Sequence, residues 1–317
     1  MDGSNANYVE LIAKTLELRG NVVTNDLKVV AGSNKIDKKG NITGKNNTSN
    51  NIAIDGRELG GMYAGVIKII STDKGAGVNS DAFIVSKNSK LEITADGKIK
   101  VNKVQGKGID IKGKEYEQKD LAYSDEGISI NADKIKLSGT GTQANKQINL
   151  NGTVENNATI YTKEGLKTKG LTNTGTVQAI NKIEVEGNLT NRGEILTNGN
   201  LTAKDTTSTK KLIAKEGVSV DKLENSGIVA TDKKLDIKGN LINSGEVQAV
   251  DNISILGNVN NSGEVLTNSS FSAKNTVSTK RLIAKEGITT DTVFELLTSV
   301  KDKITKPLVF LVYYNLV

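Results

Sequence analysis

The chain contains no histidine and no cysteine, and these two absences remove much familiar catalytic chemistry. Without them, no Ser-His-Asp or Cys-His nucleophile system exists. A zinc site built from His or Cys ligands is also excluded. No disulfide forms, so stability has to come from packing and hydrogen bonds. Acid–base work would fall to Asp, Glu, Lys or Tyr.

Aromatic residues are scarce, at 3% of 317 residues, and tryptophan is absent. A globular domain of this length normally buries many large aromatic side chains. The core must therefore consist mainly of Ile, Val, Leu and Ala, which fit a thin, pleated, half-buried surface. This composition favours a solenoid over a thick globule.

Neither sign of charge strongly predominates. The 42 basic and 36 acidic residues give a net charge of +6, and the two signs are finely mixed along the chain. Such mixing indicates a solvated surface. A nucleic-acid protein would cluster its basic residues and place aromatics among them. We therefore expect no nucleic-acid partner.

What the chain does contain is a repeat. STKKLIAKEGV at 208–218 returns as STKRLIAKEGI at 278–288, 70 positions later. A shorter period lies inside, because Asn-x-Gly triplets recur at spacings of 18, 34, 18 and 18, where 34 is close to twice 17. These triplets start at Asn173, Asn191, Asn225, Asn243 and Asn261. The basic unit is therefore 17–18 residues, and four units make the 70.

Within a unit, apolar and polar residues alternate with period two, as in the segments 182–185, 234–237 and 252–255. This alternation is typical of half-buried strands. Each strand is short before a Gly or Asn, which tolerate positive φ, turns the chain. The sequence predicts an all-β fold, a right-handed parallel β-helix (solenoid) with about 17–20 residues per coil. The right hand follows from the crossover preference of parallel strands. We expect no helix over 60–290, and strands in the N-terminal segment up to Val30.

Two N-terminal segments resemble a known family. ANYVELIAKTLELRGNVVTNDLKVVAGSNKID, from Ala6 to Asp37, is similar to the later part of the secretion domain of two-partner-secretion exoproteins, the filamentous-haemagglutinin-like adhesins. LGGMYAGVIKIISTDKGAGVNSDAFI, from Leu59 to Ile84, is the stronger match, through its runs LGGMYA and KGAGV. The Asn-x-Gly coils that follow resemble the adhesin-repeat stalk of the same family.

The resemblance implies an exoprotein exported by the Sec machinery and then threaded through a dedicated outer-membrane β-barrel transporter. It implies a secreted or cell-surface, non-enzymatic adhesin that attaches to a host receptor or glycan. We expect three regions: the rear part of a secretion domain at 1–155, β-helical adhesin repeats at 156–290, and an atypical apolar tail at 291–317. The alternatives are the stalk of a contact-dependent toxin-delivery exoprotein and a β-helical polysaccharide-degrading enzyme.

The chain also departs from the family pattern. Its N-terminus lacks the features of a signal peptide, and the single proline, Pro307, leaves no Asn-Pro-Asn motif of the kind that the family's transporter reads. We therefore expect a truncated, internal piece of a larger adhesin. The repeat predicts Asn-x-Gly at 295, where the sequence has Glu295-Leu296-Leu297. The tail is interpreted as an out-of-frame end, with an apolar C-terminal cap or a membrane anchor as alternatives.

Three short motifs invite a chemical interpretation. Gly108–Lys114 has the spacing of a phosphate-binding loop, but Glu115 stands where Ser or Thr should bind magnesium. Gly139-Thr140-Gly141 is predicted to be a turn, and Ser124–Gly127 a solvated turn or a calcium site. A β-helical enzyme needs clustered carboxylates, and no such pair stands out. We therefore expect no catalytic residue, no cofactor and no metal site.

One candidate binding site remains. The basic pairs Lys210-Lys211 and Lys280-Arg281 recur with the 70-residue repeat. Stacked four coils apart, they would form a basic stripe that attracts anionic glycans. Ordinary solvated corners of the solenoid explain the same residues.

Overall fold

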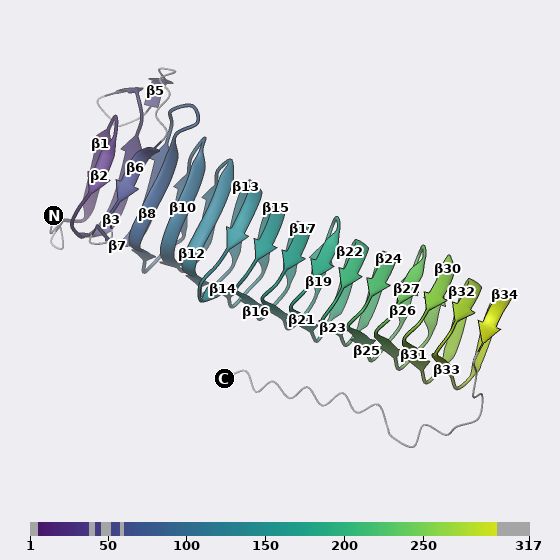
Figure 1. Ribbon diagram of the computed structural model, residues 1–317. Coiled ribbons are helices and arrows are strands. Elements are labelled where there is room, and N and C mark those ends of the chain that lie inside the picture. The colour runs from purple at the N-terminus through teal and green to yellow at the C-terminus, as the bar shows by residue number, and fades with distance from the viewer. Residues whose placement is uncertain (1–5, 38–41, 46–51, 58–59, 297–317) are drawn as a thin grey trace. The chain divides into compact units, whose positions relative to one another are not determined.

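The computed structural model describes residues 6–37, 42–45, 52–57 and 60–296. The chain divides into two compact units, residues 1–180 and 181–317. Each unit is a stack of short parallel strands that wind as a solenoid (Figure 1). Among the described residues there is no helix, and so none long and apolar enough to cross a membrane. The expected all-β parallel β-solenoid is confirmed.

Each coil of the first unit has three strand segments, here called its first, second and third faces in chain order. The longest strands bend at a corner and serve two faces. The strands are β1 (Tyr8–Ala13), β2 (Leu16–Leu18), β3 (Val22–Ala31), β6 (Ile52–Gly56), β7 (Met62–Ser71), β8 (Gly77–Ser86), β9 (Leu91–Thr94), β10 (Lys98–Gly106), β11 (Ile109–Lys112), β12 (Glu115–Ser124), β13 (Ile128–Leu137), β14 (Gly141–Ala144), β15 (Ile148–Asn156), β16 (Thr159–Thr162), β17 (Leu166–Asn173) and β18 (Thr176–Ala179). A separate antiparallel pair, β4 (Asn34–Ile36) and β5 (Ile42–Lys45), belongs to neither stack.

The second unit repeats the three-face plan in shorter coils. Its strands are β19 (Ile183–Val185), β20 (Leu189–Asn191), β21 (Glu194–Thr197), β22 (Asn200–Ser208), β23 (Lys211–Ala214), β24 (Gly217–Asn225), β25 (Ile228–Thr231), β26 (Leu235–Ile237), β27 (Leu241–Asn243), β28 (Glu246–Ala249), β29 (Ile253–Ile255), β30 (Asn258–Asn261), β31 (Glu264–Thr267), β32 (Ser270–Ser278), β33 (Arg281–Ala284) and β34 (Gly287–Leu296).

Alternation places one aliphatic ladder inside each face. On the first face of the first unit, Ile109 pairs with Ile128 and Ile128 with Ile148, and all three are at most 2% exposed. Each buried side chain of this size stabilises the fold by about 1.5–3 kcal/mol. Each coil advances by about 4.8 Å, the spacing of neighbouring strands. The predicted core of Ile, Val, Leu and Ala is thus the observed one.

The repeated phrase is one coil segment that returns four turns later. β23 of the first copy pairs with β25, β25 with β28, β28 with β31, and β31 with β33 of the second copy. The successive starts at 211, 228, 246, 264 and 281 are 17 or 18 residues apart. The predicted coil length and the four-coil repeat are therefore confirmed.

The asparagines of the Asn-x-Gly triplets form a buried ladder at the corner after the second face. The Nδ2 of Asn225 donates to the Oδ1 of Asn243 at 2.9 Å, and that of Asn243 donates to Asn261 at 2.8 Å. Each of these amides also bonds the backbone oxygen two residues on, such as that of Gly245 at 3.1 Å. The Asn side chain thus holds its own turn and the next coil together.

The glycine of the triplet is required by the tight stacking of these corners. A Cβ on Gly245 would lie 2.2 Å from the oxygen of Gly227, and one on Gly263 would lie 2.0 Å from that of Gly245. In two coils the corner after the second face reads STK, and Ser208 and Ser278 occupy the ladder position there. The Nδ2 of Asn191 donates to Ser208 at 3.5 Å, and that of Asn261 donates to Ser278 at 3.0 Å. Ser-Thr-Lys is therefore a variant of the Asn-x-Gly corner, which explains the double spacing of 34 in the sequence.

The two ends of the described chain extend the strand predictions. The N-terminal segment forms β1 and β2, so the strand interpretation is confirmed there. At the other end, β34 pairs with β32 and includes the first six residues of the predicted tail. Its register shifts after Thr276, so that Ser278 faces Leu296 rather than the expected position 295. Residues 297–317, the rest of the predicted tail, lie outside the described part.

Candidate functional surfaces

The described part of the run LGGMYA, which carries part of the family resemblance, lies at the third face of an N-terminal coil. β7 pairs with β3, and Met62 at its start is fully buried. The N–H of Gly61 donates to the Oδ1 of Asn21 at 3.1 Å. A Cβ on Gly60 would lie 2.0 Å from the oxygen of Leu18, so this position needs glycine. The described part of LGGMYA is thus explained by close packing of neighbouring coils.

A buried carboxylate, that of Asp73, bonds the chain at the point where it leaves the stack after β3. Between β3 and β6 the chain leaves the stack and forms the β4–β5 pair, which Figure 1 shows beside the solenoid strands. Asp73, 2% exposed, accepts from the Ser33 N–H at 2.5 Å and from its hydroxyl at 3.3 Å. Thr72 donates to the Oδ1 of Asn34 at 2.6 Å. These bonds fix where the excursion departs.

Charges on the second face of the first unit are matched in ion pairs. Its outward row reads Lys100, Glu117, Lys136 and Glu155 through four coils. The ammonium of Lys98 donates to Glu117 and holds the pKa of that carboxyl below its usual range. Such alternation is what a solvated face requires, and half-exposed pairs of this kind stabilise little.

The three motifs with chemical interpretations are parts of the coil framework. The segment 108–114 contains β11 and leads directly into β12, so no helix follows it to cradle a phosphate. Gly139 has φ +77° and lies in a turn, as expected. Ser124 donates to the backbone of Lys107 at 3.0 Å and anchors the corner with Asp125. In the described part of the chain no group of three metal-ligating side chains occurs.

The four basic residues of the candidate stripe fall at two separated places. Lys210 and Lys280 lie at the corner of the STK coils, and Lys211 and Arg281 begin β23 and β33. The row that joins the last two passes through Ile228, Glu246 and Glu264. The Nη1 of Arg281 lies 3.5 Å from the Oε2 of Glu264. The structure thus brings each pair together, but two carboxylates lie between the pairs. The glycan stripe stays a prediction.

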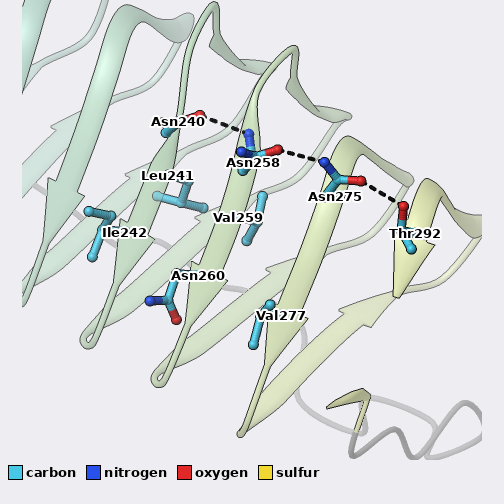
Figure 2. Close-up of a pocket in the computed structure, with 9 residues that line it drawn as sticks. All are labelled: Asn240, Leu241, Ile242, Asn258, Val259, Asn260, Asn275, Val277 and Thr292. Carbon is cyan, nitrogen blue, oxygen red and sulfur yellow. Dashed lines mark hydrogen bonds between the residues drawn. The ribbon is translucent and has the colours of Figure 1, made fainter. Parts of the chain in front are cut away.

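A groove of about 600 Å³ lies on the second face of the second unit, and Figure 2 shows the side chains that line it. Asn240, Asn258, Asn275 and Thr292 form a chain of hydrogen bonds of 2.9, 2.9 and 2.7 Å along consecutive coils. Ile242 is 49% exposed beside them. Because these polar groups already bond one another, we interpret this surface chain of hydrogen bonds as a contact that holds neighbouring coils together, and not as a ligand site.

Sequence reasoning missed one row on the third face of the first unit. It is called here the Tyr–Gln row, and it consists of Gln105, Tyr123, Gln143, Tyr161 and Gln178 in five consecutive coils. All five side chains are half-buried or exposed. A signal existed in the sequence: the two tyrosines and the first two glutamines are each separated by 38 positions, the length of two coils.

Comparison with known proteins places these features in a family. Residues 1–101 match the family model of the TPS secretion domain. The tRNA nuclease CdiA of Yersinia mollaretii is 25% identical over 187 residues, which cover 54% of this chain and 6% of that protein. The tRNA nuclease CdiA-2 of Burkholderia pseudomallei is 33% identical over 102 residues, 31% of this chain and 3% of that protein. The 16S rRNA endonuclease CdiA of Enterobacter cloacae is 35% identical over 81 residues, 25% of this chain and 2% of that protein.

No solved structure gave a significant match. The matched stretches span 6% or less of these relatives, so their names describe proteins far longer than the shared region. The match to the secretion domain includes β1 to β9 and the segment Leu59–Ile84, which carries the stronger sequence resemblance. The recognition made from the sequence is thereby confirmed: residues 1–101 carry the TPS secretion domain, and the chain is a relative of the filamentous-haemagglutinin-like and CdiA exoproteins of two-partner secretion systems.

Proposed function

We propose that this chain is the export and display segment of a non-enzymatic adhesin. Residues 1–101 engage an outer-membrane β-barrel transporter, and the β-solenoid that follows is carried to the cell surface or released, where it mediates attachment. The observation that supports this most is the secretion-domain match over a segment that folds as the first coils of a solenoid. Two-partner exoproteins are secreted and surface-associated.

The repeated coils support a display role by the way they are built. Each coil contacts mainly its neighbours, so a solenoid lengthens by adding coils without redesigning a core. The recurrent features of the second unit, the asparagine ladder and the STK corners, bond coil to coil. A segment of this kind can hold a binding surface at a distance from the membrane, and this role requires no catalytic residues.

A second candidate function is the stalk of a contact-dependent toxin-delivery exoprotein. It is favoured by the names of the relatives, which include a toxin CdiA of Yersinia pestis that is 31% identical over 109 residues, 33% of this chain. In that case the toxic activity resides in sequence outside the shared region. A β-helical polysaccharide-degrading enzyme is the remaining alternative, which depolymerisation of an acidic polysaccharide by the purified chain would support.

Export is the direct test of the proposal. The full chain, preceded by a Sec signal peptide and the N-terminal cap of a two-partner exoprotein, is co-expressed with that exoprotein's transporter. We expect full-length chain outside the cell only when the transporter is present. A matched variant that lacks residues 1–101 should stay in the periplasm. Equal release with and without the transporter would contradict the proposal.

Attachment separates the adhesin from the toxin stalk. Surface-exported chain should increase the binding of the producing cells to host cells, relative to cells that carry the transporter alone. A stalk that only delivers a toxin would leave host-cell attachment unchanged, and would inhibit neighbouring bacteria once a toxin domain is fused to its C-terminus.

A further inference from the structure

The Tyr–Gln row differs from the other outward rows of the first unit in its chemistry. From Gln105 to Gln178 it contains no charged side chain through five coils. The adjacent outward row on the same face begins with one charged residue, Lys103, and continues uncharged through Leu121, Gly141, Thr159 and Thr176. The second face of the same coils instead alternates Lys with Glu. From the coil of Tyr123 onward, the third face is therefore an uncharged strip beside charged ones.

The polar groups of this row are largely unused by the fold. In the described residues, the side chains of Gln105, Gln143, Tyr161 and Gln178 make no hydrogen bond. The exception is Tyr123, whose hydroxyl donates to the Oδ1 of Asp125 at 3.1 Å. That bond raises the pKa of Tyr123, so the phenol stays neutral over the physiological range. Three amides and two phenol rings thus face outward from fixed positions.

Strand pairing sets the distances along the row. Tyr123 pairs with Gln143, and Gln143 pairs with Tyr161, so the two rings are separated by two coils, or about 10 Å. The amides stand in the coils between and beside them. This alternation has the length of one disaccharide in an extended, β-linked sugar chain. Such a chain presents an apolar ring face and a fringe of hydroxyls, again in alternation.

We propose that the Tyr–Gln row binds an extended, neutral, β-linked polysaccharide along the axis of the first unit. The rings of Tyr123 and Tyr161 stack on the apolar faces of alternate sugar rings. Tyrosine suits this role because it offers a large amphipathic surface and loses little side-chain entropy. Gln105, Gln143 and Gln178 exchange hydrogen bonds with the hydroxyls, since each amide both donates and accepts.

The same observations disfavour two other partners. Nucleic acid and anionic glycans are bound through Lys and Arg that neutralise their charges, and the row has none. The row also begins after residue 101, where the secretion-domain match ends, which argues against a role in transporter recognition. Because the strands hold the row rigid, binding requires no ordering of the backbone.

This site rests on the proposed attachment function but can be tested apart from export. Binding of cellohexaose and chitohexaose to the purified full chain is measured by titration calorimetry, with maltohexaose, whose α-linked chain curves, as a comparison. We expect the β-linked oligosaccharides to bind and the α-linked one to bind more weakly. Each single variant, Y123A and Y161A, should weaken binding by roughly threefold to tenfold, and Y123A/Y161A should abolish it.

Two further variants separate stacking from folding. Q143Y/Y161Q keeps the composition but moves the rings to adjacent coils, about 4.8 Å apart. We expect it to bind more weakly than the wild type, while Y161F keeps most of the affinity. Tyr8, 52% exposed outside the row, supplies the matched control Y8A, which should bind normally. Thermal melting checks that each variant is folded.

The outcomes discriminate clearly. Absence of binding to every β-linked oligosaccharide, or equal affinity in Y123A/Y161A and the wild type, would overturn the site. Loss of export in Y123A/Y161A without glycan binding by the wild type would assign the row to the transporter and also overturn it. Normal glycan binding by a chain that the transporter does not export would leave the site standing and defeat the proposed export function alone.

Discussion

The two units close the corner after the second face of each coil with different side chains. In the first unit, the paired positions at this corner hold Leu18, Gly56, Ser80, Val101, Gln118 and Leu137 in successive coils, and then Asn156 and Asn173 in its last two. In the second unit the same position holds Asn or Ser in every described coil up to Ser278. The first unit thus varies the residue at this corner through six coils, whereas the second unit repeats Asn or Ser.

The buried Gln118 shows what a local solution requires. Its Nε2 donates to the oxygen of Gly141 at 2.8 Å, and its Oε1 accepts from the hydroxyl of Thr142 at 3.0 Å. The fully buried Tyr116 donates to the same Oε1 at 3.4 Å. The hydrogen bonds of Gln118 join it to Tyr116, Gly141 and Thr142 and are not repeated from coil to coil. The asparagine ladder instead passes each bond to the next coil, so the two units should respond differently to damage.

The largest loss of stability is expected at the glycines of the Asn-x-Gly corners, where a side chain does not fit. G245K places a Cβ about 2.2 Å from the oxygen of Gly227 and should lower the free energy of unfolding by roughly 3 kcal/mol. Native STK corners combine Lys with Ser at the ladder position. N243S/G245K should therefore lose less than the sum of the two single variants, as measured by urea unfolding. If the stability losses of the two single variants simply add in the double variant, the claim that Ser-Thr-Lys is a variant of the Asn-x-Gly corner would be contradicted.

Removal of one ladder amide should have the next largest effect. N243L deletes bonds to Gly245, Asn261 and Glu264 and leaves buried groups unpaired, which costs about 2–3 kcal/mol. Hydrogen exchange should rise in the coils of Asn225 and Asn261 as well. The exposed N260L is the matched control and should change stability by less than about 0.5 kcal/mol. Faster exchange confined to residues 241–245 would show that the ladder does not couple coils.

Alkaline pH should weaken the first unit in particular. Burial raises the pKa of Tyr116 far above its usual value. The unfolded chain then loses this proton first, so stability is intact below about pH 10 and falls above it by about 1.4 kcal/mol per pH unit. Melting curves between pH 9 and 11.5 should show this slope in the wild type. Y116F should flatten it, and an unchanged slope would show that Tyr116 is not the group responsible.

The smallest effect is expected from the surface ion pairs. E117Q removes the partner of Lys98, whose hydrogen bond lowers the pKa of Glu117. A lowered pKa stabilises the fold above about pH 4 and loses that contribution as the pH falls through the folded-state value. The variant should cost less than about 1 kcal/mol at pH 7, and this cost should shrink as the pH falls below about 4. A larger loss would mean that the charge ladders matter more than the corners.

How much of this followed from the sequence differs between the units. The second unit was predictable because coils of 17 or 18 residues repeat the same apolar alternation, so period and strands could be read directly. The identity of the STK corner was missed because Ser replaces Asn and Lys replaces Gly. The double spacing of 34 between Asn191 and Asn225 was its only trace.

For the first unit, the sequence predicted only the fold class, a parallel β-solenoid. Its coils vary in length, since first-face strands begin at 91, 109, 128, 148 and 166. No fixed period therefore exposes Gln118, and the Tyr–Gln row shows in the sequence only through the spacing of 38 between its tyrosines and between its first two glutamines. The β4–β5 excursion was missed for the same reason. Its closure depends on Asp73 meeting Ser33, a contact across 40 positions that no local pattern reveals. The family resemblance supplied what periodicity did not.

A deletion tests most directly whether the repeated phrase is one coil segment that returns after four turns. Removing residues 211–280 joins Lys210 to Arg281 and restores the phrase STKRLIAKEGI, four coils shorter. We predict a folded chain with the same strand-type circular dichroism per residue and a solenoid shorter by about 19 Å in small-angle scattering. Removing residues 211–271 instead, which breaks the coil register, should prevent cooperative folding. Unfolding of the in-register deletion, or equal stability of both, would contradict the account.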